Sequence, residues 1–287
     1  MDQNERESCI GSSIRGVDNT AQSTLKGHCI AGLDWFEFTL WDFSVPAIME
    51  QLLRLSPEQF QKSQGSYHGY CTKYTLGADG MITIWADGGA QQGVHVIITG
   101  RGCAYLQEVM PFLDLLMALS SLYVQVTRLD LALDDKTGNW YTVAQLVDHA
   151  RSMEIISQWR GCDVSMGYSL TSGENDKAVI YIGSTRSDMF LRVYDKRLEQ
   201  NARGVHLAGL PEQWTRWEFC LRNEKAQAVM WKLQQGSSLN QLFADLLSES
   251  MRIVKADKQQ TNRSRWKVRT KWLRFVPAIA QADGRSA

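Results

Sequence analysis

Three segments of the chain alternate apolar with ionisable side chains, and this alternation limits the possible folds more than any other feature of the sequence. The segments are 128–134, 191–194 and 216–222. Because side chains two residues apart on a strand point to the same face of a sheet, each segment is predicted to be a strand with one apolar and one ionisable face. The chain therefore requires a sheet that is covered on one face and carries charge on the other.

The ionisable faces of these strands hold the first candidate site. If the strands are neighbours with aligned faces, six side chains could converge: Asp130, Asp134, Arg192, Tyr194, Arg216 and Glu218. One interpretation is a solvated face with salt bridges. The alternative is a site in which carboxylates hold Mg²⁺ or Mn²⁺, since these cations prefer oxygen ligands and also bind substrate phosphate. A tyrosine beside such a cation could attack a phosphodiester, and the pattern leaves both interpretations open.

Strand and helix patterns are mixed along the rest of the chain. Two β-rich runs, 81–86 and 93–99, flank the turn signal Asp87-Gly88-Gly89 and predict a hairpin. Helical periodicity covers three further segments, 104–120, 142–155 and most of 226–254. Hairpins combined with helices predict an α+β fold, with a largely antiparallel central sheet flanked by helices and a basic C-terminal helix.

Charge is unevenly distributed, although the 31 Lys and Arg residues balance the 31 Asp and Glu residues. Residues 251–287 contain 10 basic and 2 acidic side chains, so the remainder is net acidic. In this segment Val268, Trp272 and Phe275 have helical spacing. The segment is predicted to be a docked amphipathic helix with a solvated charged face, or a surface for phosphate groups, and the two are compatible. The candidate phosphate-binding residues are Arg265, Lys267, Arg269, Lys271 and Arg274.

Several classes of protein are excluded by what the sequence lacks. No run reaches the roughly 18 consecutive apolar residues of a membrane span, and residues 1–7 are acidic, unlike the start of an export signal. The six cysteines form no C-x-x-C pair, and the five histidines form no His-x-His pair. We therefore expect a cytoplasmic protein with reduced thiols, no membrane partner and no histidine-based metal site.

Four short segments, in order, resemble the rolling-circle replication initiators of the trans-acting plasmid type. They are Thr127–Asp130, Tyr181–Ser184, Leu191–Glu199 and Thr215–Glu218. This family includes initiation proteins of small plasmids and filamentous phages, and it is related to relaxases of conjugative elements. The resemblance extends from about residue 30 to residue 275, and it includes a V-Y-D-K-x-x-E element that ends at Glu199.

The resemblance implies an enzyme that nicks and rejoins DNA. Tyr194 would attack a phosphodiester at a replication origin, leaving a 5′-phosphotyrosine link and a free 3′-OH, from a position at a strand-to-helix junction. Tyr181 is the rival nucleophile, but its apolar neighbours favour a packed strand tyrosine. The implied ligands of Mg²⁺ or Mn²⁺ are Asp130, Glu218 and Glu199. The residues implied to contact phosphate or orient the tyrosine are Arg192, Lys196 and Arg216.

Composition divides the chain, and the resemblance supplies the roles of its parts. Residues 1–25 are predicted to be a flexible polar tail, residues 26–250 the nicking and joining domain, and residues 251–287 a basic helical segment and C-terminal tail. The implied partners are origin DNA, double- and single-stranded, a host helicase and polymerase, and a second copy of the chain. A conjugative relaxase of the same chemistry and a non-enzymatic DNA-binding regulator with this fold are alternative interpretations.

Overall fold

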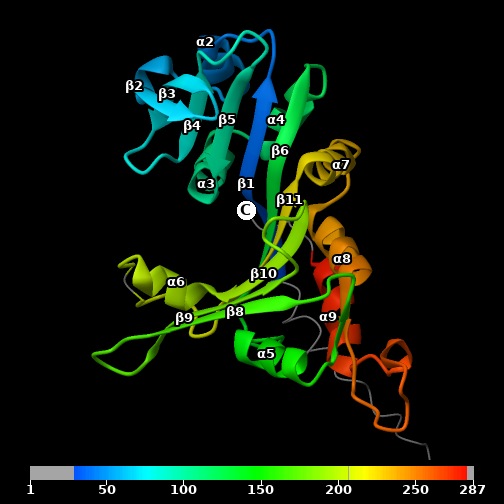
Figure 1. The fold of residues 1–287 in the computed structure, drawn as a ribbon. Coiled ribbons are helices and arrows are strands. Elements are labelled where there is room, and N and C mark those ends of the chain that lie inside the picture. Colours follow the sequence, from blue (N-terminus) through cyan, green and yellow to red (C-terminus); the bar gives the residue numbers. More distant parts are fainter. Residues whose placement is uncertain (1–28, 206, 283–287) are drawn as a thin grey trace, which may run out of the picture.

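Ten strands, each antiparallel to its neighbours, form one sheet in the computed structural model, which describes residues 29–205 and 207–282 (Figure 1). The order across the sheet is β2-β3-β4-β5-β1-β6-β11-β10-β9-β8. The bounds are β1 (Cys29–Leu40), β2 (Phe60–Tyr67), β3 (Tyr70–Leu76), β4 (Ile82–Ala86), β5 (Val94–Thr99), β6 (Val124–Asp135), β8 (Cys162–Tyr168), β9 (Asn175–Ile182), β10 (Met189–Asp195) and β11 (Thr215–Arg222). The predicted hairpin is confirmed as β4 and β5. The predicted tail at 1–25 lies outside the described residues.

Helices pack around this sheet, which confirms the predicted α+β class with a largely antiparallel sheet. The α-helices are α2 (Val45–Ala47), α3 (Gly100–Val109), α4 (Phe112–Leu119), α5 (Val143–Arg151), α6 (Lys196–Ala202), α7 (Asn223–Gln234), α8 (Leu239–Ser250) and α9 (Thr270–Gln281). A separate two-stranded sheet joins β7 (Ile155–Ser157) to β12 (Met251–Ile253). The segment predicted as helical over 226–254 is therefore two helices followed by a strand.

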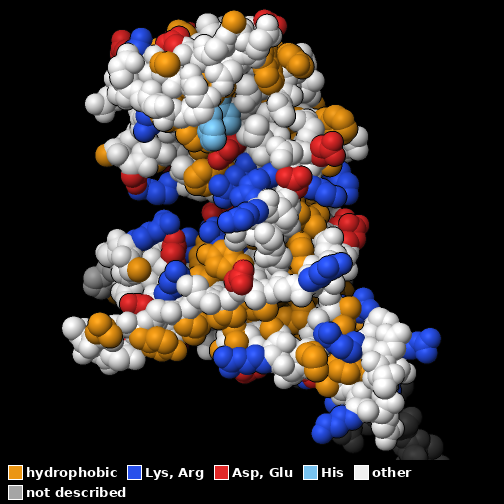
Figure 2. Space-filling view, viewed as in Figure 1, with side chains coloured by type: hydrophobic (Ala, Val, Ile, Leu, Met, Phe, Trp, Pro, Cys, Tyr) orange, Lys and Arg blue, Asp and Glu red, His pale blue; other side chains and the backbone are white. Residues whose placement is uncertain are grey.

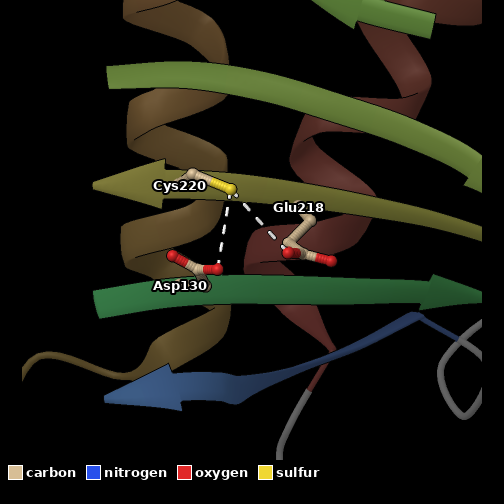
Figure 3. A group of neighbouring side chains, drawn as sticks. All are labelled: Asp130, Glu218 and Cys220. Atoms are coloured by element: carbon tan, nitrogen blue, oxygen red, sulfur yellow. Dashed lines mark hydrogen bonds between the residues drawn. The ribbon is translucent and has the colours of Figure 1, made fainter. Parts of the chain in front are cut away.

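One face of the sheet is apolar because β6 and β11 alternate as predicted. Leu131 and Leu133 of β6 have no exposed surface, and they lie opposite Phe219 and Trp217 of β11. Helices α7, α8 and α9 pack against this side, and Figure 3 shows helices behind the strands. Burial of each large apolar side chain stabilises the fold by about 1.5–3 kcal/mol. The ionisable residues of the same strands are left on the opposite face.

The two ends of the sheet belong to two lobes of the molecule, and the central strands connect the lobes (Figure 1). One lobe contains β2 to β5, the other contains β8 to β10 with α5 and α6, and β1, β6 and β11 connect them. Figure 2 shows that the surface is notched between the lobes and that Lys and Arg side chains gather along the notch. The strands that carry the candidate site are therefore close to the junction of the lobes.

A β-bulge in β1 changes which of its residues share a face with the candidate site. Leu33 lies opposite Leu131 and Trp35 lies opposite Asp130, so Asp34 is the extra residue between them. A bulge of this kind inserts one residue and bends the strand. Trp35 thereby joins the ionisable face, where the Asp34 carboxylate also lies because it bonds a side chain of β11.

Two helices replace the single helix predicted over 104–120. Helix α3 ends at Val109 and α4 begins at Phe112, because Pro111 lies at the N-cap of α4 and has no N–H to continue the helical hydrogen bonds. Within the described part of the chain, no single helix is long and apolar enough to cross a membrane, although the pair α3 and α4, bent by 95°, reaches that length and composition together.

The basic C-terminal segment is helical only in its second half. Helix α9 begins at Thr270, so Lys271 and Arg274 are the predicted basic residues that lie within it. Val268, predicted as part of the apolar stripe of this helix, instead forms an antiparallel β-bridge with Val254. This pairing holds the chain before Thr270 in an extended form, so the predicted helix starts later than the periodicity indicates.

Candidate active site

The three alternating strands are neighbours, and their ionisable faces are aligned. Strand β11 lies between β6 and β10. The register places Arg192 opposite Glu218 and Tyr194 opposite Arg216, and it places Arg216 opposite Asp134 on the other side. Side chains directly opposite each other have Cβ atoms about 4.5–5.5 Å apart. The six ionisable residues that the alternation singles out therefore form one cluster.

Tyr194 and Glu218 form the centre of the cluster. The Tyr194 hydroxyl donates a hydrogen bond to Glu218 Oε2 over 3.3 Å, and Arg192 Nη2 donates to the other carboxylate oxygen, Oε1. Both Tyr194 and Glu218 are buried, and the Arg192 guanidinium lies 5.1 Å from the centre of the Tyr194 ring. Arg192 thus holds in place the Glu218 carboxylate, which accepts the hydrogen bond from the Tyr194 hydroxyl.

The environment of Tyr194 keeps its phenol protonated at neutral pH. Burial raises the pKa of Tyr194 well above its ordinary value, and the negative charge of Glu218 raises it further. The positive charges of Arg216 and Arg192 act in the opposite direction and do not compensate. The hydroxyl of Tyr194 is therefore a proton donor, and a nucleophilic role for this oxygen requires a base that takes its proton.

Lys196 and Glu199 lie at the start of α6, directly after Tyr194. Asp195 is the N-cap of this helix and accepts from the backbone N–H of Leu198 at 3.0 Å. Lys196 Nζ lies 2.8 Å from Glu199 Oε2 and 5.6 Å from the centre of the Tyr194 ring. Burial by itself raises the pKa of Glu199, but the hydrogen bonds from Lys196 and Gln200 and the charges of Lys196 and Arg203 together lower it. The predicted strand-to-helix junction is present at this point.

A second group of acidic and sulfur atoms lies on β6 and β11 (Figure 3). Asp130, Glu218 and Cys220 each offer one possible ligand atom, and these atoms lie within 4.8 Å of one another. Cys220 Sγ lies 3.6 Å from Asp130 Oδ2 and 3.8 Å from Glu218 Oε1, so its single S–H can donate a hydrogen bond to either carboxylate. Glu199 is not part of this group; a second basic side chain, Arg203, lies 2.5 Å from its other oxygen.

The donor set of this group fits a divalent cation. Two carboxylates and one sulfur atom are chemically suited to binding a metal ion. In this structure, arginine side chains neutralise the negative charge of the two carboxylates. Arg128 donates to both Asp130 oxygens, at 2.9 and 2.5 Å, and Arg192 bonds Glu218. Burial raises the pKa of Asp130, against the lowering effect of Arg128. A metal ion here would compete with the two guanidinium groups.

Arg216 is held by two carboxylates. Its Nε and Nη2 donate to the Asp134 oxygens, both at 2.8 Å, and Nη1 donates to Asp34 Oδ1 at 2.6 Å. Trp214 also donates to Asp134, at 2.7 Å. Burial by itself raises the pKa of Asp134, but the bonds from Arg216 and Trp214 lower it overall. Arg216 is thus held opposite Tyr194, and all three of its guanidinium nitrogens donate hydrogen bonds to the carboxylates of Asp34 and Asp134.

A hollow of about 260 Å³ lies beside Arg216 on the same face. Its lining includes Gly32 and Ala132, which lie opposite each other in β1 and β6. A Cβ atom added to Gly32 would meet nothing within 4 Å. The hollow is also lined by Asp34 and Asp134, so it borders the side of the cluster where these two carboxylates hold Arg216.

Some residues of this cluster are not among the site residues that the sequence predicts. Arg128 and Cys220 occupy the ionisable faces of β6 and β11, so the alternation contained a signal for both. Asp34 had no such signal, because a bulge that adds one residue to β1 cannot be recognised from alternation alone. Tyr181, the rival nucleophile, lies opposite Arg192, but no hydrogen bond of its hydroxyl to a carboxylate occurs among the described residues.

The basic C-terminal residues lie apart from Tyr194, because α9 packs with α8 on the helix-covered side of the sheet (Figure 1). Arg269 donates hydrogen bonds to both carboxylate oxygens of Glu154, at 2.8 and 2.7 Å, and the two residues form a structural ion pair. Lys271 lies 4.9 Å from the centre of the Tyr141 ring, and Tyr141 is itself buried. The exposed basic side chains of the predicted set are Arg265, Lys267 and Arg274.

Comparison with known proteins shows the class to which this chain belongs, the rolling-circle replication initiation proteins. Residues 124–283 match the family model described as "Replication initiation factor". Residues 30–112 match a second model, "Rolling Circle replication initiation protein N-terminal domain". The chain belongs to the replication initiation factor family, as the resemblance of its motifs predicts.

Two individual relatives extend this comparison. NicK of Bacillus subtilis (strain 168), which is named as a DNA relaxase, is 27% identical over 258 residues, covering 88% of this chain and 72% of NicK. A rolling circle replication initiator protein from Geobacillus stearothermophilus has a similar fold, with a TM-score of 0.78 and 24% identity. That similarity covers 88% of this chain and 97% of the other.

Proposed function

We propose that the protein nicks one strand of DNA at a replication origin by tyrosine transesterification and so initiates rolling-circle synthesis. Tyr194 is the nucleophile and Glu218 is the base. The observation that carries this proposal is the hydrogen bond from the Tyr194 hydroxyl to Glu218 Oε2, on a sheet face where Arg192 fixes the same carboxylate. Membership of the replication initiation factor family supports the substrate class.

The covalent step uses the groups of this chain as follows. Glu218 Oε2 takes the phenol proton as Tyr194 Oη attacks phosphorus, and the bond from phosphorus to the 3′ oxygen breaks. The 5′ phosphate becomes linked to Tyr194, and the released 3′ oxygen takes up a proton to become a 3′-OH. The raised pKa of Tyr194 makes the base necessary, because little tyrosinate exists at neutral pH.

Basic groups around the ring stabilise the charge of the phosphodiester. Lys196 Nζ and the Arg192 guanidinium both lie within 6 Å of the centre of the Tyr194 ring, so they are placed to donate to phosphate oxygens. Arg216 acts as a positioning residue, since Asp34 and Asp134 hold it. The hollow over Gly32 and Ala132, which Arg216 also lines, would receive part of the DNA strand.

A divalent cation, Mg²⁺ or Mn²⁺, is part of the same proposal. Asp130 and Glu218 would hold it, and when bound it would stabilise negative charge on the transferring phosphoryl oxygens. Glu199 is not included, because Lys196 and Arg203 occupy its carboxylate. Chelation with EDTA should stop nicking by wild-type protein, and equal activity in EDTA would refute the metal requirement.

The proposal extends to the partners of the protein. Arg265, Lys267 and Arg274 would contact phosphates of origin DNA outside the nicking site, because their side chains are exposed. A host polymerase would extend the 3′-OH, and a host helicase would separate the strands. Action as a homodimer and a cytoplasmic location are further parts of the proposal.

The decisive experiment is nicking of supercoiled origin DNA with Mg²⁺ or Mn²⁺ by wild-type protein, Tyr194→Phe and Tyr181→Phe. We expect wild type and Tyr181→Phe to nick and to form a covalent protein–DNA adduct, and Tyr194→Phe to form none. An adduct with Tyr194→Phe would exclude Tyr194 as the nucleophile. Wild-type protein that binds the DNA without nicking it would indicate a non-enzymatic regulator.

A conjugative relaxase is the second candidate, and the similarity to NicK favours it. Its covalent chemistry would be the same, so the site does not distinguish the two functions. The DNA that is cut does. Nicking of a transfer origin, with no nicking at the replication origin of the same element, would favour the relaxase.

A further inference from the structure

A cavity of about 640 Å³ lies between α5, the first turn of α9 and the chain around Lys255. Tyr141 forms part of its wall and packs against Trp217, which belongs to the apolar face of the sheet. The cavity is therefore on the side of the sheet opposite to Tyr194. Its volume falls within the range of roughly 300–1,000 Å³ that is usual for small-molecule sites.

Basic side chains dominate the lining of this cavity. Glu154 neutralises one of them, Arg269, and Asp148 is the acidic residue of the lining. The other basic residues are three lysines, and among the described residues none of them forms an ion pair with a carboxylate. They are Lys255, Lys267 and Lys271. The cavity thus has an excess of positive charge.

Backbone pairing holds two of these lysines next to each other. Val254 and Val268 form an antiparallel bridge, and the backbone N–H of Lys255 donates to the Lys267 carbonyl at 2.8 Å. Lys255 therefore lies directly opposite Lys267, and both line the cavity. Like charges directly opposite each other on paired strands are destabilising. An anion bound between them would stabilise this arrangement.

The first turn of α9 contributes further donors. Its N-cap residue, Arg269, makes no side-chain cap hydrogen bond, and Arg269, Thr270 and Lys271 all line the cavity. The free backbone N–H groups and the positive end of the helix dipole favour an anion at this position. Burial lowers the pKa of Lys271, although the charge of Asp135 acts in the opposite direction. An anion beside Lys271 would stabilise its charged form.

The hydroxyl of Tyr141 is a buried polar group without a partner. Tyr141 is 2% exposed, and its hydroxyl has no hydrogen-bond partner among the described residues. Burial raises the pKa of this phenol to about 12, and the charge of Arg269, another lining residue, acts in the opposite direction. Buried hydroxyls are normally hydrogen-bonded. The Tyr141 hydroxyl is thus available to donate to a ligand in the cavity.

We propose that this cavity binds the phosphate groups of a small ligand, of the nucleoside diphosphate class, at a site separate from the nicking site. Three unpaired lysines match a ligand with several negative charges, and phosphate oxygens accept charge-assisted hydrogen bonds. Duplex DNA has the same phosphate chemistry, but its convex backbone meets exposed side chains, whereas Arg269 and Lys271 are half-buried. The inference does not rest on the proposed function, because this binding requires neither Tyr194 nor nicking.

The test is calorimetric titration with inorganic pyrophosphate, without DNA and with EDTA present. We expect wild-type protein to bind pyrophosphate, ADP to compete for the same site, and adenosine not to compete. Lys271→Met keeps an unbranched side chain but removes the charge, so it should weaken pyrophosphate binding about tenfold or more. Lys232→Met is the matched control, because it removes an exposed lysine of α7, and it should bind as wild type does.

Two further variants complete the test. Tyr141→Phe should weaken pyrophosphate binding without lowering the urea midpoint of the ligand-free protein, because the hydroxyl that it removes has no partner in the fold. Lys255→Met, at an exposed position of the lining, serves if Lys271→Met does not fold.

Several results would overturn the inference. They are no pyrophosphate binding by wild-type protein, wild-type affinity in both Lys271→Met and Tyr141→Phe, and loss of binding in Lys196→Met instead, which would place the anion at the nicking site. Failure of ADP to compete would exclude the nucleotide class. A tenfold loss of duplex DNA affinity in Lys271→Met would assign the cavity to DNA and overturn the small-ligand inference. Pyrophosphate binding by protein that never nicks DNA would refute only the proposed function.

Discussion

Tyr194 donates its hydroxyl hydrogen bond to the same carboxylate, Glu218, that Arg192 binds from the other side. The two oxygens of Glu218 thus have different partners: Oε2 faces the phenol, and Oε1 faces the guanidinium and the Cys220 thiol. In the proposed reaction this one carboxylate would both accept the phenol proton and hold a cation, and it lies on a strand that is paired on both sides.

Glu218→Gln should separate these roles from simple DNA binding. The amide cannot take the phenol proton, so we expect the nicking rate to fall about 10²- to 10⁴-fold, with little change in DNA affinity. The residual nicking rate of Glu218→Gln should rise with pH, because the Tyr194 hydroxyl must then lose its proton to solvent. Single-turnover nicking from pH 7 to pH 9.5 measures both effects, with the exposed Glu212→Gln as control. A wild-type rate in Glu218→Gln would exclude Glu218 as the base.

Asp34→Asn should impair nicking although Asp34 does not bond Tyr194. The substitution weakens the hold on Arg216 Nη1, and small displacements at a reacting centre are costly, so we expect kcat to fall about tenfold with KM nearly unchanged. Asp42→Asn is the control, since Asp42 is exposed and has φ of 62°, a conformation that asparagine tolerates. Equal loss of kcat in both variants would argue against a positioning role.

Glu154 should make the stability of the C-terminal segment depend on pH. Burial opposes ionisation of Glu154, but hydrogen bonds from the Ala256 backbone, Arg269 and His149 lower its pKa to about 2. Because this folded pKa lies below the ordinary value of 4.5, the stabilisation is present above pH 4.5 and is lost as the pH falls towards 2.

Glu154→Gln tests this linkage. We expect it to lower the free energy of unfolding by about 2 kcal/mol at pH 7, because it replaces charged hydrogen bonds to Arg269. The difference from wild type should shrink as the pH falls from 4.5 to 2. Urea unfolding across this range measures it, with the exposed Glu249→Gln as control. A difference that does not change with pH would contradict the assignment.

Lys267→Ala and Arg274→Ala should weaken DNA binding uniformly across sequences. Both side chains are exposed, and removing one phosphate-binding charge should reduce the slope of log affinity against log salt by about 0.9. Arg269→Ala should instead destabilise the fold, because Arg269 bonds Glu154. Affinity measured over a salt series separates these outcomes. An unchanged slope for both exposed residues would leave the segment with a structural role only.

The alternation of β6, β10 and β11 predicts the arrangement of the site well, because it reports directly which side chains share a face. It even places Arg128 and Cys220 correctly. It cannot report registers between distant strands, so the pairing of Arg192 with Glu218 required the structure. The bulge at Asp34 could not be predicted from the sequence either. A bulge depends on how β1 pairs with β6, and alternation within β1 does not report that pairing.

Periodicity is less reliable where other interactions decide the backbone. Val268 fits a helical stripe with Trp272 and Phe275, yet its pairing with Val254 keeps it extended. The hairpin of β2 and β3 is not predicted because β2 has mostly polar, exposed side chains, which give no apolar pattern to detect. Both differences occur where tertiary interactions override the local sequence preference.

In the proposed reaction, the pairing of β10 determines where the DNA end is held after cleavage. Tyr194 is joined by its neighbours Val179 and Arg216 to strands on both sides. A DNA end attached to this tyrosine would be anchored to the middle of a sheet that cannot swing as a loop can. The attached DNA end would then stay at one fixed place on the protein during replication. Rejoining would require the 3′ end of the displaced strand to return to Tyr194.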